Sequence, residues 1–304
     1  MKILIASPIF EEAIERLREK NDVVLAFNAG TDELKKRISD RDALVFRSGV
    51  DINADVMARA PGLRLLVRAG SGCDNVDLDY VQKNGLEIIR IPGPGARAVA
   101  ELGFSLMLAL ARQIVVADKL LRSGRWAKHE LSGYLLAGKT LAIYGAGNIG
   151  SLLGCLGHAW DMDVIGCVKN PSAERAAELL KHGVRLAGAD EVLATGDFLS
   201  INLPLTDETR NLIDKQAISR MKPGSFLVNL ARGGIVDEHA LLEALTGGRL
   251  AGAGLDVHAS EGEGKISPLV GLSNVILTPH IGAMTVDSQR AIGDRIIEIV
   301  AQRS

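Results

Sequence analysis

The sequence has few cysteines and aromatic residues, almost no net charge and no long apolar stretch. Its three cysteines, Cys73, Cys155 and Cys167, include no CxxC pair, which argues against a disulfide framework. Lysine and arginine (35) nearly balance aspartate and glutamate (37), so the formal net charge of -2 gives no basic footprint for nucleic acid. No signal-peptide pattern and no run of membrane-spanning length is present. We therefore expect a soluble, cytoplasmic protein without nucleic-acid or membrane partners.

The composition and the order of the predicted elements indicate a layered α/β protein. At 304 residues the chain is long for a single core, and its 47% hydrophobic content with only 4% aromatic residues points to aliphatic cores. Short apolar strands alternate with amphipathic helices, which is typical of a parallel sheet. The predicted strands of the first half are 2–6, 23–26, 43–46, 64–67 and 87–91, and the helices between them are 11–20 and 32–39.

A turn-rich break at Pro92-Gly93-Pro94-Gly95 is the best domain boundary. A long apolar helix is predicted from 96 to about 112, and a second helix ends near 122. Glu101 lies within the apolar part of the first helix, so we expect it to be buried with a structural partner. The remaining predicted elements are strands at 140–144, 163–168, 198–202, 225–229, 251–255 and 275–277, and a helix at 285–302 that is expected to pack on the amino-terminal domain.

A glycine turn, Gly145-Ala146-Gly147-Asn148-Ile149-Gly150, lies between a predicted strand and a predicted helix. In this context Gly145 permits the tight turn, Gly147 lets a pyrophosphate approach the backbone, and Gly150 lets the helix pack closely on the strand. The unpaired amides at the helix start, together with the helix dipole, favour a negatively charged ligand. The pattern predicts a dinucleotide site in a Rossmann domain.

The strand after this turn ends at Val168-Lys169-Asn170, where an acid usually binds the ribose 2′-hydroxyl of NAD. Without that carboxylate the 2′-phosphate of NADP is not repelled, and Lys169 can pair with it as a point charge. Alternatively, Lys169 is a solvated loop residue and either cofactor binds. We expect NAD(H) or NADP(H) as the cofactor, with NADP slightly favoured.

Two loops of the amino-terminal half follow predicted strands. One is Arg47-Ser48-Gly49, and the other is Arg68-Ala69-Gly70-Ser71-Gly72-Cys73-Asp74. Ligands of open parallel sheets bind beyond the carboxyl ends of the strands, and the amides of such loops can hold a carboxylate. Ordinary turn chemistry is the alternative interpretation.

Side chains suited to hydride-transfer chemistry follow later strands. Arg232 follows the strand 225–229, and its planar guanidinium suits bidentate recognition of a carboxylate. His280 follows the strand 275–277 and is suited to reversible proton transfer near neutral pH. Glu261, or alternatively Glu263, lies in the glycine-rich loop after 251–256 and could pair with the imidazole. His258 is interpreted as structural, with an active-site-rim role as the alternative, and the other histidines as surface, loop or helix residues.

Several motifs resemble, in the same order, those of the D-isomer-specific 2-hydroxyacid dehydrogenases, particularly the phosphoglycerate-dehydrogenase-like branch. The segments that carry the resemblance are 229–237, 252–257 and 278–285, with further similarity at 67–77, 98–101 and 202–209. The similarity extends over nearly the whole chain, and several separate motifs in the right order make the resemblance far more specific than the glycine turn alone.

The resemblance implies a role for each site residue. Arg232 would bind the substrate carboxylate and carbonyl oxygen, His280 would be the acid/base, and Glu261 would be its partner. The implied cofactor contacts are Gly145, Gly147, Asn148, Ile149, Gly150, Lys169, Leu203, Pro204, Ala231 and Asp256. The implied substrate contacts are Arg47, Ser48, Arg68, Gly70, Ser71 and Gly72, of which Arg47 and Arg68 could face an anionic tail.

The resemblance also implies an α/β fold of two doubly wound parallel-sheet domains. These are a flavodoxin-like substrate-binding domain, residues 1–94 completed by the helix 284–304, and an NAD(P)-binding Rossmann domain, residues 95–283. The expected protein is an oxidoreductase that forms a homodimer through the cofactor domain. It transfers a hydride to or from C2 of a small D-2-hydroxy or 2-keto acid of the phosphoglycerate, hydroxypyruvate or glyoxylate type. The alternative is a dinucleotide-sensing binding protein of the corepressor type. No histidine pair has metal-ligand spacing, so no metal is expected.

Overall fold

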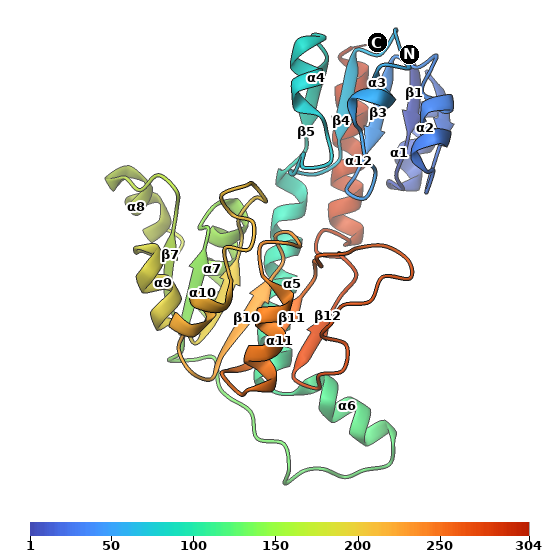
Figure 1. The fold of residues 1–304 in the computed structure, drawn as a ribbon. Helices are drawn as coiled ribbons and strands as arrows, with labels where there is room; N and C mark the ends of the chain where they lie inside the picture. Colours follow the sequence, from blue (N-terminus) through green and yellow to red (C-terminus); the bar gives the residue numbers. More distant parts are fainter. Residues whose placement is uncertain (304) are drawn as a thin grey trace. The chain divides into compact units, whose positions relative to one another are not determined.

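The computed structural model describes residues 1–303 and divides into two α/β units (Figure 1). Unit 1 comprises Met1–Gly95 and the carboxyl-terminal segment from Ala283 onward, and unit 2 comprises Ala96–Gly282. These limits lie within one residue of the predicted domain boundaries.

Unit 1 contains a five-stranded parallel sheet in the order β2-β1-β3-β4-β5. The central strands are buried along their whole length, as expected where helices cover both faces of a sheet. The strands are β1 (Lys2–Ile5), β2 (Asp22–Leu25), β3 (Ala43–Phe46), β4 (Leu65–Arg68) and β5 (Glu87–Arg90). The helices are α1 (Glu11–Arg18), α2 (Thr31–Arg37), α3 (Ala54–Met57), α4 (Leu78–Lys83) and α12 (Val286–Ala301), of which the short α3 and α4 were not predicted.

Helix α12 completes the core of unit 1. Its buried residues Ile292, Ile296 and Ile299 recur at helical spacing and belong to the same hydrophobic cluster as strand β1. A Cβ atom built on Gly293 would lie only 2.8 Å from the Cβ of Ala13, so this glycine allows α12 to pack closely on α1. The expected packing of the last helix on the amino-terminal domain is therefore confirmed.

Unit 2 contains a seven-stranded parallel sheet in the order β12-β11-β10-β9-β6-β7-β8. All six predicted strands are present, but the two-residue edge strand β8 was missed because it is too short to show a pattern. The strands are β6 (Thr140–Tyr144), β7 (Asp163–Cys167), β8 (Arg185–Leu186), β9 (Phe198–Ile201), β10 (Ser225–Asn229), β11 (Leu250–Leu255) and β12 (Val275–Leu277). The helices are α5 (Gly93–Ala111), α6 (Ile114–Arg122), α7 (Asn148–Ala159), α8 (Ala173–Leu180), α9 (Ala189–Thr195), α10 (Lys215–Arg220) and α11 (Glu238–Thr246).

Helix α5 corrects two expectations. It begins at Gly93, inside the predicted break, because proline is tolerated in the first turn of a helix, where its missing N–H costs no hydrogen bond. Glu101 is not buried: its side chain is 57% exposed and lies 4.0 Å from Arg97 on the solvent face of the helix. Half of the helix is buried, and it is the one helix among residues 1–303 with the length and composition to span a membrane.

Strand β6 lies between β9 and β7, at the point where the strand order reverses. In open parallel sheets this reversal leaves a crevice beyond the carboxyl ends of the strands, where ligands bind. The fold therefore places the glycine turn, which follows β6, at the switch point of the sheet in unit 2.

Candidate active site

The glycine turn has the geometry that a dinucleotide requires. Gly145 adopts φ of +100°, and a Cβ atom there would lie 2.7 Å from the carbonyl oxygen of Asn202. A Cβ atom on Gly150 would lie 2.6 Å from the carbonyl oxygen of Gly145, whereas one on Gly147 would meet nothing within 4 Å. Two of the glycines are therefore needed for packing, and the third borders open space through which a phosphate can approach.

Helix α7 begins at Asn148, directly at this turn, with Gly147 as its N-cap and no side-chain cap. The amides of its first turn, including those of Asn148 and Ile149, have no acceptor within the helix. Leu203 lies beside the turn, since its Cδ2 is 2.9 Å from a Cβ built on Gly145, and the following Pro204 is exposed. The residues present thus fit the pyrophosphate of a nicotinamide dinucleotide.

Lys169 follows β7, where the ribose 2′ position is expected, and it is paired. Its Nζ lies 2.6 Å from Oε2 of Glu208, and both side chains are largely exposed (77% and 73%). The hydrogen bond from Lys169 and its charge lower the pKa of the Glu208 carboxyl. A second cation lies close by, because Arg175 donates from Nη2 to the carbonyl oxygen of Ala146 inside the turn at 2.6 Å. Neither Glu208 nor Arg175 was predicted.

His280 and Glu261, the residues predicted to act as an acid/base pair, lie in direct contact. Nδ1 of His280 lies 2.8 Å from Oε2 of Glu261, which decides between Glu261 and Glu263. Because a carboxylate accepts, this contact places a proton on Nδ1 and leaves Nε2 for proton transfer. Burial raises the pKa of the Glu261 carboxyl, but the hydrogen bond and charge of His280 and the His258 amide outweigh it, so the pKa lies below its ordinary value.

His258 supports both members of this pair. Its backbone N–H donates to Oε1 of Glu261 at 3.1 Å, and its Nε2 lies 2.9 Å from the carbonyl oxygen of Thr278, two residues before His280. Since the acceptor is a carbonyl, Nε2 carries the proton. The buried Nδ1 has no hydrogen-bond partner within residues 1–303. His258 thus lies beside the Glu261–His280 pair and helps to hold both residues in place.

Asp256 fixes the backbone that carries His280. Its side chain is only 1% exposed and accepts hydrogen bonds from Thr278 Oγ1 (2.6 Å), the Ile281 amide (2.8 Å) and the Gly282 amide (2.7 Å). His280 itself adopts φ of 55°, a left-handed conformation that persists where the surroundings hold it. Asp256 was expected beside the nicotinamide, but the structure shows its carboxylate engaged in positioning this segment.

Arg232 follows β10, and its segment lies against the segment that contains His258. Its Nη1 donates to the carbonyl oxygen of Ala231 at 2.7 Å, and Asn229 accepts from the Ala231 amide and donates to the Arg232 carbonyl oxygen. A Cβ atom on Gly233 would lie 1.8 Å from the carbonyl oxygen of His258, so the two segments are in direct backbone contact. Arg232, Glu261 and His280 therefore gather at the carboxyl edge of the sheet that bears the glycine turn. Glu261 and His280 also line a cavity of about 600 Å³.

In unit 1 the structure separates the two predicted tail arginines. Arg68 is 4% exposed, its Nε donates to the carbonyl oxygen of Gly72 at 2.7 Å, and its guanidinium lies against Gly70. It thus supports the loop that was predicted to hold a carboxylate, and this corrects the expectation that it faces a substrate tail. Arg47 is half-buried and donates to Oε1 of Gln289 at 2.5 Å, and burial lowers its pKa.

The remaining loop residues of unit 1 lie as the strand pattern predicts. Ser48 follows β3 and is exposed, and Ser71 is exposed at the tip of the loop after β4. In unit 2, Cys155 is half-buried with its Sγ 3.1 Å from Nδ1 of His182, and Cys167 is buried.

Residues 104–282 match the family model described as D-isomer specific 2-hydroxyacid dehydrogenase, NAD binding domain. The chain is 39% identical over 298 residues to a D-3-phosphoglycerate dehydrogenase of Mycobacterium bovis, covering 98% of this chain and 56% of that protein, so it spans little more than half of that relative. It is 37% identical over 300 residues to a hydroxypyruvate reductase of Thermotoga maritima, covering 98% of this chain and 96% of that protein.

A solved structure shares the whole fold. D-lactate dehydrogenase from Aquifex aeolicus, complexed with NAD and lactic acid, superposes with a TM-score of 0.88 at 26% identity and covers 99% of this chain and 94% of its own. The glycine turn, the Glu261–His280 pair and the matched family model agree with one another. The chain belongs to the D-isomer specific 2-hydroxyacid dehydrogenase family, and its unit 2 is the nicotinamide-dinucleotide-binding domain of that family.

Proposed function

We propose that this protein is an NAD(P)-dependent dehydrogenase of short D-2-hydroxy acids. The observation that carries the proposal is the Glu261–His280 contact of 2.8 Å at the same sheet edge as Arg232 and the glycine turn. An acid/base pair, a carboxylate-binding cation and a dinucleotide site are the three requirements of this reaction.

Each side chain has a defined task in the reduction of a 2-keto acid. A bound reduced nicotinamide supplies the hydride that C2 of the substrate accepts. His280 donates a proton from Nε2 to the carbonyl oxygen, and Glu261 stabilises the imidazolium through Nδ1. Arg232 binds the substrate carboxylate and stabilises the charge that develops on the carbonyl oxygen. In the oxidative direction the same imidazole, unprotonated at Nε2, takes the hydroxyl proton.

We further propose that unit 1 contributes substrate contacts through the loops after β3 and β4. The amides of Ser71 and Gly72 are suited to a carboxylate, and Arg68 keeps a cation beneath them. Of the two predicted tail arginines only Arg47 is more than marginally exposed, so the preference between a phosphorylated and a short keto acid would depend on it.

For the cofactor we propose that the site accepts NADP(H) as well as NAD(H). The supporting observation is that β7 is followed by Val168-Lys169 and not by an acid, so no carboxylate at this strand end repels the 2′-phosphate.

The first test is the initial rate of NADH and NADPH oxidation with glyoxylate, hydroxypyruvate, 3-phosphohydroxypyruvate and pyruvate. Turnover of at least one keto acid is expected. His280→Ala should lower kcat by about 10³-fold or more while cofactor binding is retained, and Arg232→Ala should raise KM and lower kcat together. His239→Ala, an exposed histidine of α11, is the matched control. Turnover by His280→Ala close to that of the wild type would overturn the proposal.

We also propose that two copies associate through the arm, defined here as residues 112–135. Figure 1 shows this arm, α6 and the coil after it, extending from one end of the sheet in unit 2. An exposed apolar surface of this kind typically marks an interaction site. Its large apolar side chains, each at least half exposed, are Ile114, Val115, Leu121, Trp126, Tyr134 and Leu135.

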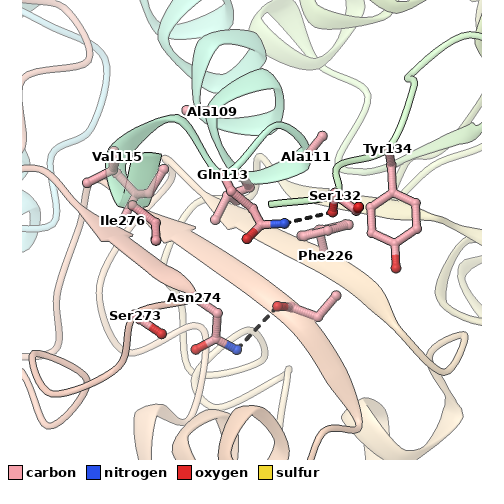
Figure 2. Close-up of a pocket in the computed structure, with 13 residues that line it drawn as sticks. Ala109, Ala111, Gln113, Val115, Ser132, Tyr134, Phe226, Ser273, Asn274 and Ile276 are labelled. Atoms are coloured by element: carbon pink, nitrogen blue, oxygen red, sulfur yellow. Dashed lines mark hydrogen bonds between the residues drawn. The ribbon is translucent and has the colours of Figure 1, made fainter. Parts of the chain in front are cut away.

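The base of the arm borders a cavity of about 300 Å³, beside the strand starts of β10, β11 and β12 (Figure 2). Gln113 donates from Nε2 to the carbonyl oxygen of Ser132 at 2.7 Å, which joins the two ends of the arm. Light scattering after gel filtration should give the mass of a dimer for the wild type and a smaller mass for Trp126→Asp combined with Leu135→Asp. Lys119→Ala, on helix α6 of the same arm, should leave the mass unchanged, and a monomeric wild type would contradict the proposal.

A further inference from the structure

We propose that Glu208 is a specificity-determining residue, which opposes the 2′-phosphate of NADP and accepts a hydrogen bond from the ribose 2′-hydroxyl of NAD. The inference rests on the proposed dehydrogenase function and deepens its cofactor site. It assigns to a loop after β9 the task that an acid at the end of the second strand performs in most NAD-binding domains. No acid stands at that place here, since β7 is followed by Val168 and Lys169.

Lys169 and Glu208 follow the two strands that flank the strand of the glycine turn. Lys169 follows β7, and Glu208 lies in the loop after β9. In the sheet these two strands flank β6, which bears the glycine turn. The 2.6 Å contact between Nζ and Oε2 therefore bridges the carboxyl end of β6, at the switch point of the sheet. An adenosine ribose held at the end of β7 lies next to this bridge.

Two cations and two carboxylates surround this position. Lys169 and Arg175 are the two cations, and Glu208 and Glu178 are the carboxylates that face them, at 2.6 Å for the first pair and in a direct hydrogen bond for the second. Arg175 is in addition anchored to the glycine turn by its bond to the Ala146 carbonyl oxygen. With all four groups ionised the local charge is balanced. Removing the charge of Glu208 alone leaves one positive charge in excess beside the ribose.

Glu208 therefore has opposite effects on the binding of the two cofactors. A 2′-phosphate that pairs with Lys169 competes with Glu208 for the ammonium group and lies near a carboxylate of like charge. A 2′-hydroxyl meets no such repulsion and can donate to the same carboxylate. Because both side chains of the bridge are largely exposed, their ion pair is weak and a ligand can break it. Glu208 thus limits, without abolishing, the binding of NADP.

The test measures cofactor binding by the full chain without substrate. NADH and NADPH are titrated separately, and the nicotinamide fluorescence or the heat of binding gives each Kd. Glu208→Gln should tighten NADPH by about tenfold and weaken NADH no more than about threefold. The gain for NADPH should shrink as salt is added, because exposed charges are screened. Lys169→Gln in the Glu208→Gln background should reverse most of the gain.

Glu243→Gln is the matched control. It removes the carboxylate of an equally exposed ion pair, Lys215–Glu243 at 2.7 Å, which joins α10 and α11 of the same unit. This variant should leave both dissociation constants unchanged. An NADPH-to-NADH affinity ratio that Glu208→Gln does not alter would overturn the inference while leaving the proposed function intact. Failure of the wild-type protein to bind either dinucleotide would instead overturn the proposed function and this inference with it.

Discussion

The glycine loops of the two units, residues 145–150 and 70–72, follow parallel strands but prepare for an anion by different means. In unit 2 helix α7 begins inside the loop, so its free amides and dipole face the ligand. In unit 1 helix α4 begins only at Leu78, and the loop lies on the buried guanidinium of Arg68. The same position in a parallel sheet can therefore be equipped with a helix end or with a buried cation.

The largest effect is expected from a substitution in the glycine turn that precedes helix α7. Gly145→Ala places a Cβ atom 2.7 Å from the Asn202 carbonyl oxygen in a residue with φ of +100°. Backbone strain and overpacking should together destabilise unit 2 by about 2–5 kcal/mol. Thermal unfolding should show this loss, and NADH binding should disappear with it. A melting temperature equal to that of the wild type would show that the turn does not depend on glycine here.

Gly147→Ala distinguishes an effect on ligand binding from an effect on stability. Its Cβ atom would meet nothing within 4 Å, so the melting temperature should stay within the error of measurement. The added methyl group nevertheless occupies the space through which the pyrophosphate approaches, and the Kd for NADH should rise by about 10- to 100-fold. Titration of the folded variant measures this directly. Undiminished affinity would mean that the phosphates do not pass this residue.

Arg68→Met tests the buried arginine beneath the glycine loop of unit 1. The variant leaves the Gly72 carbonyl oxygen without its donor and removes the charge beneath the loop, at a cost of about 1–3 kcal/mol in stability. The KM for the keto acid should rise by about tenfold or more, whereas the Kd for NADH should not change. Arg64→Met, an exposed arginine just before the same strand, is the control. An unchanged KM would show that the unit 1 loop does not bind the substrate.

The smallest effect concerns acid. Arginine keeps its charge at any ordinary pH, whereas Glu261 in unit 2 has a pKa below its ordinary value. Its ionised form therefore stabilises the folded state fully above the ordinary glutamate pKa, and this contribution is lost as the pH falls below that value and through the lower pKa of the folded state. Acid should accordingly weaken unit 2 through Glu261.

Both tryptophans of the chain, Trp126 and Trp160, lie in unit 2, so their fluorescence reports on that unit alone. The difference in melting temperature between the wild type and Glu261→Gln should narrow as the pH falls from 7 to about 3. Glu263→Gln, in the same loop, should show no such trend. A difference independent of pH would refute the assigned charge state of Glu261.

Patterns of local origin made much of this predictable. The alternation of buried strands and helices gave both sheets, and the glycine turn between a strand and a helix located the cofactor site. The order of Arg232, Glu261 and His280 after successive strands gave candidates that meet at one edge, because parallel strands end on the same side of a sheet.

What failed depended on contacts between segments distant in sequence. Glu101 was expected inside because its neighbours are apolar, yet it lies on the exposed stripe of α5. The burial of Arg68 beneath its own loop, the Lys169–Glu208 bridge and the left-handed backbone of His280 leave no local signal. The support of His280 by Asp256 and His258 likewise arises only when β11 and β12 are paired.

The discontinuity of unit 1 has a consequence for how the gene can be edited. The chain leaves this unit at Gly95 and re-enters at Ala283, where a Cβ atom built on the glycine would lie 3.1 Å from the alanine Cβ, and Ser288 donates to the Pro94 carbonyl oxygen. Exit and re-entry are thus adjacent, as in a host domain that carries an inserted module. A chain that joins these two ends by a short glycine–serine linker would keep β1 to β5 and α12 in one continuous polypeptide.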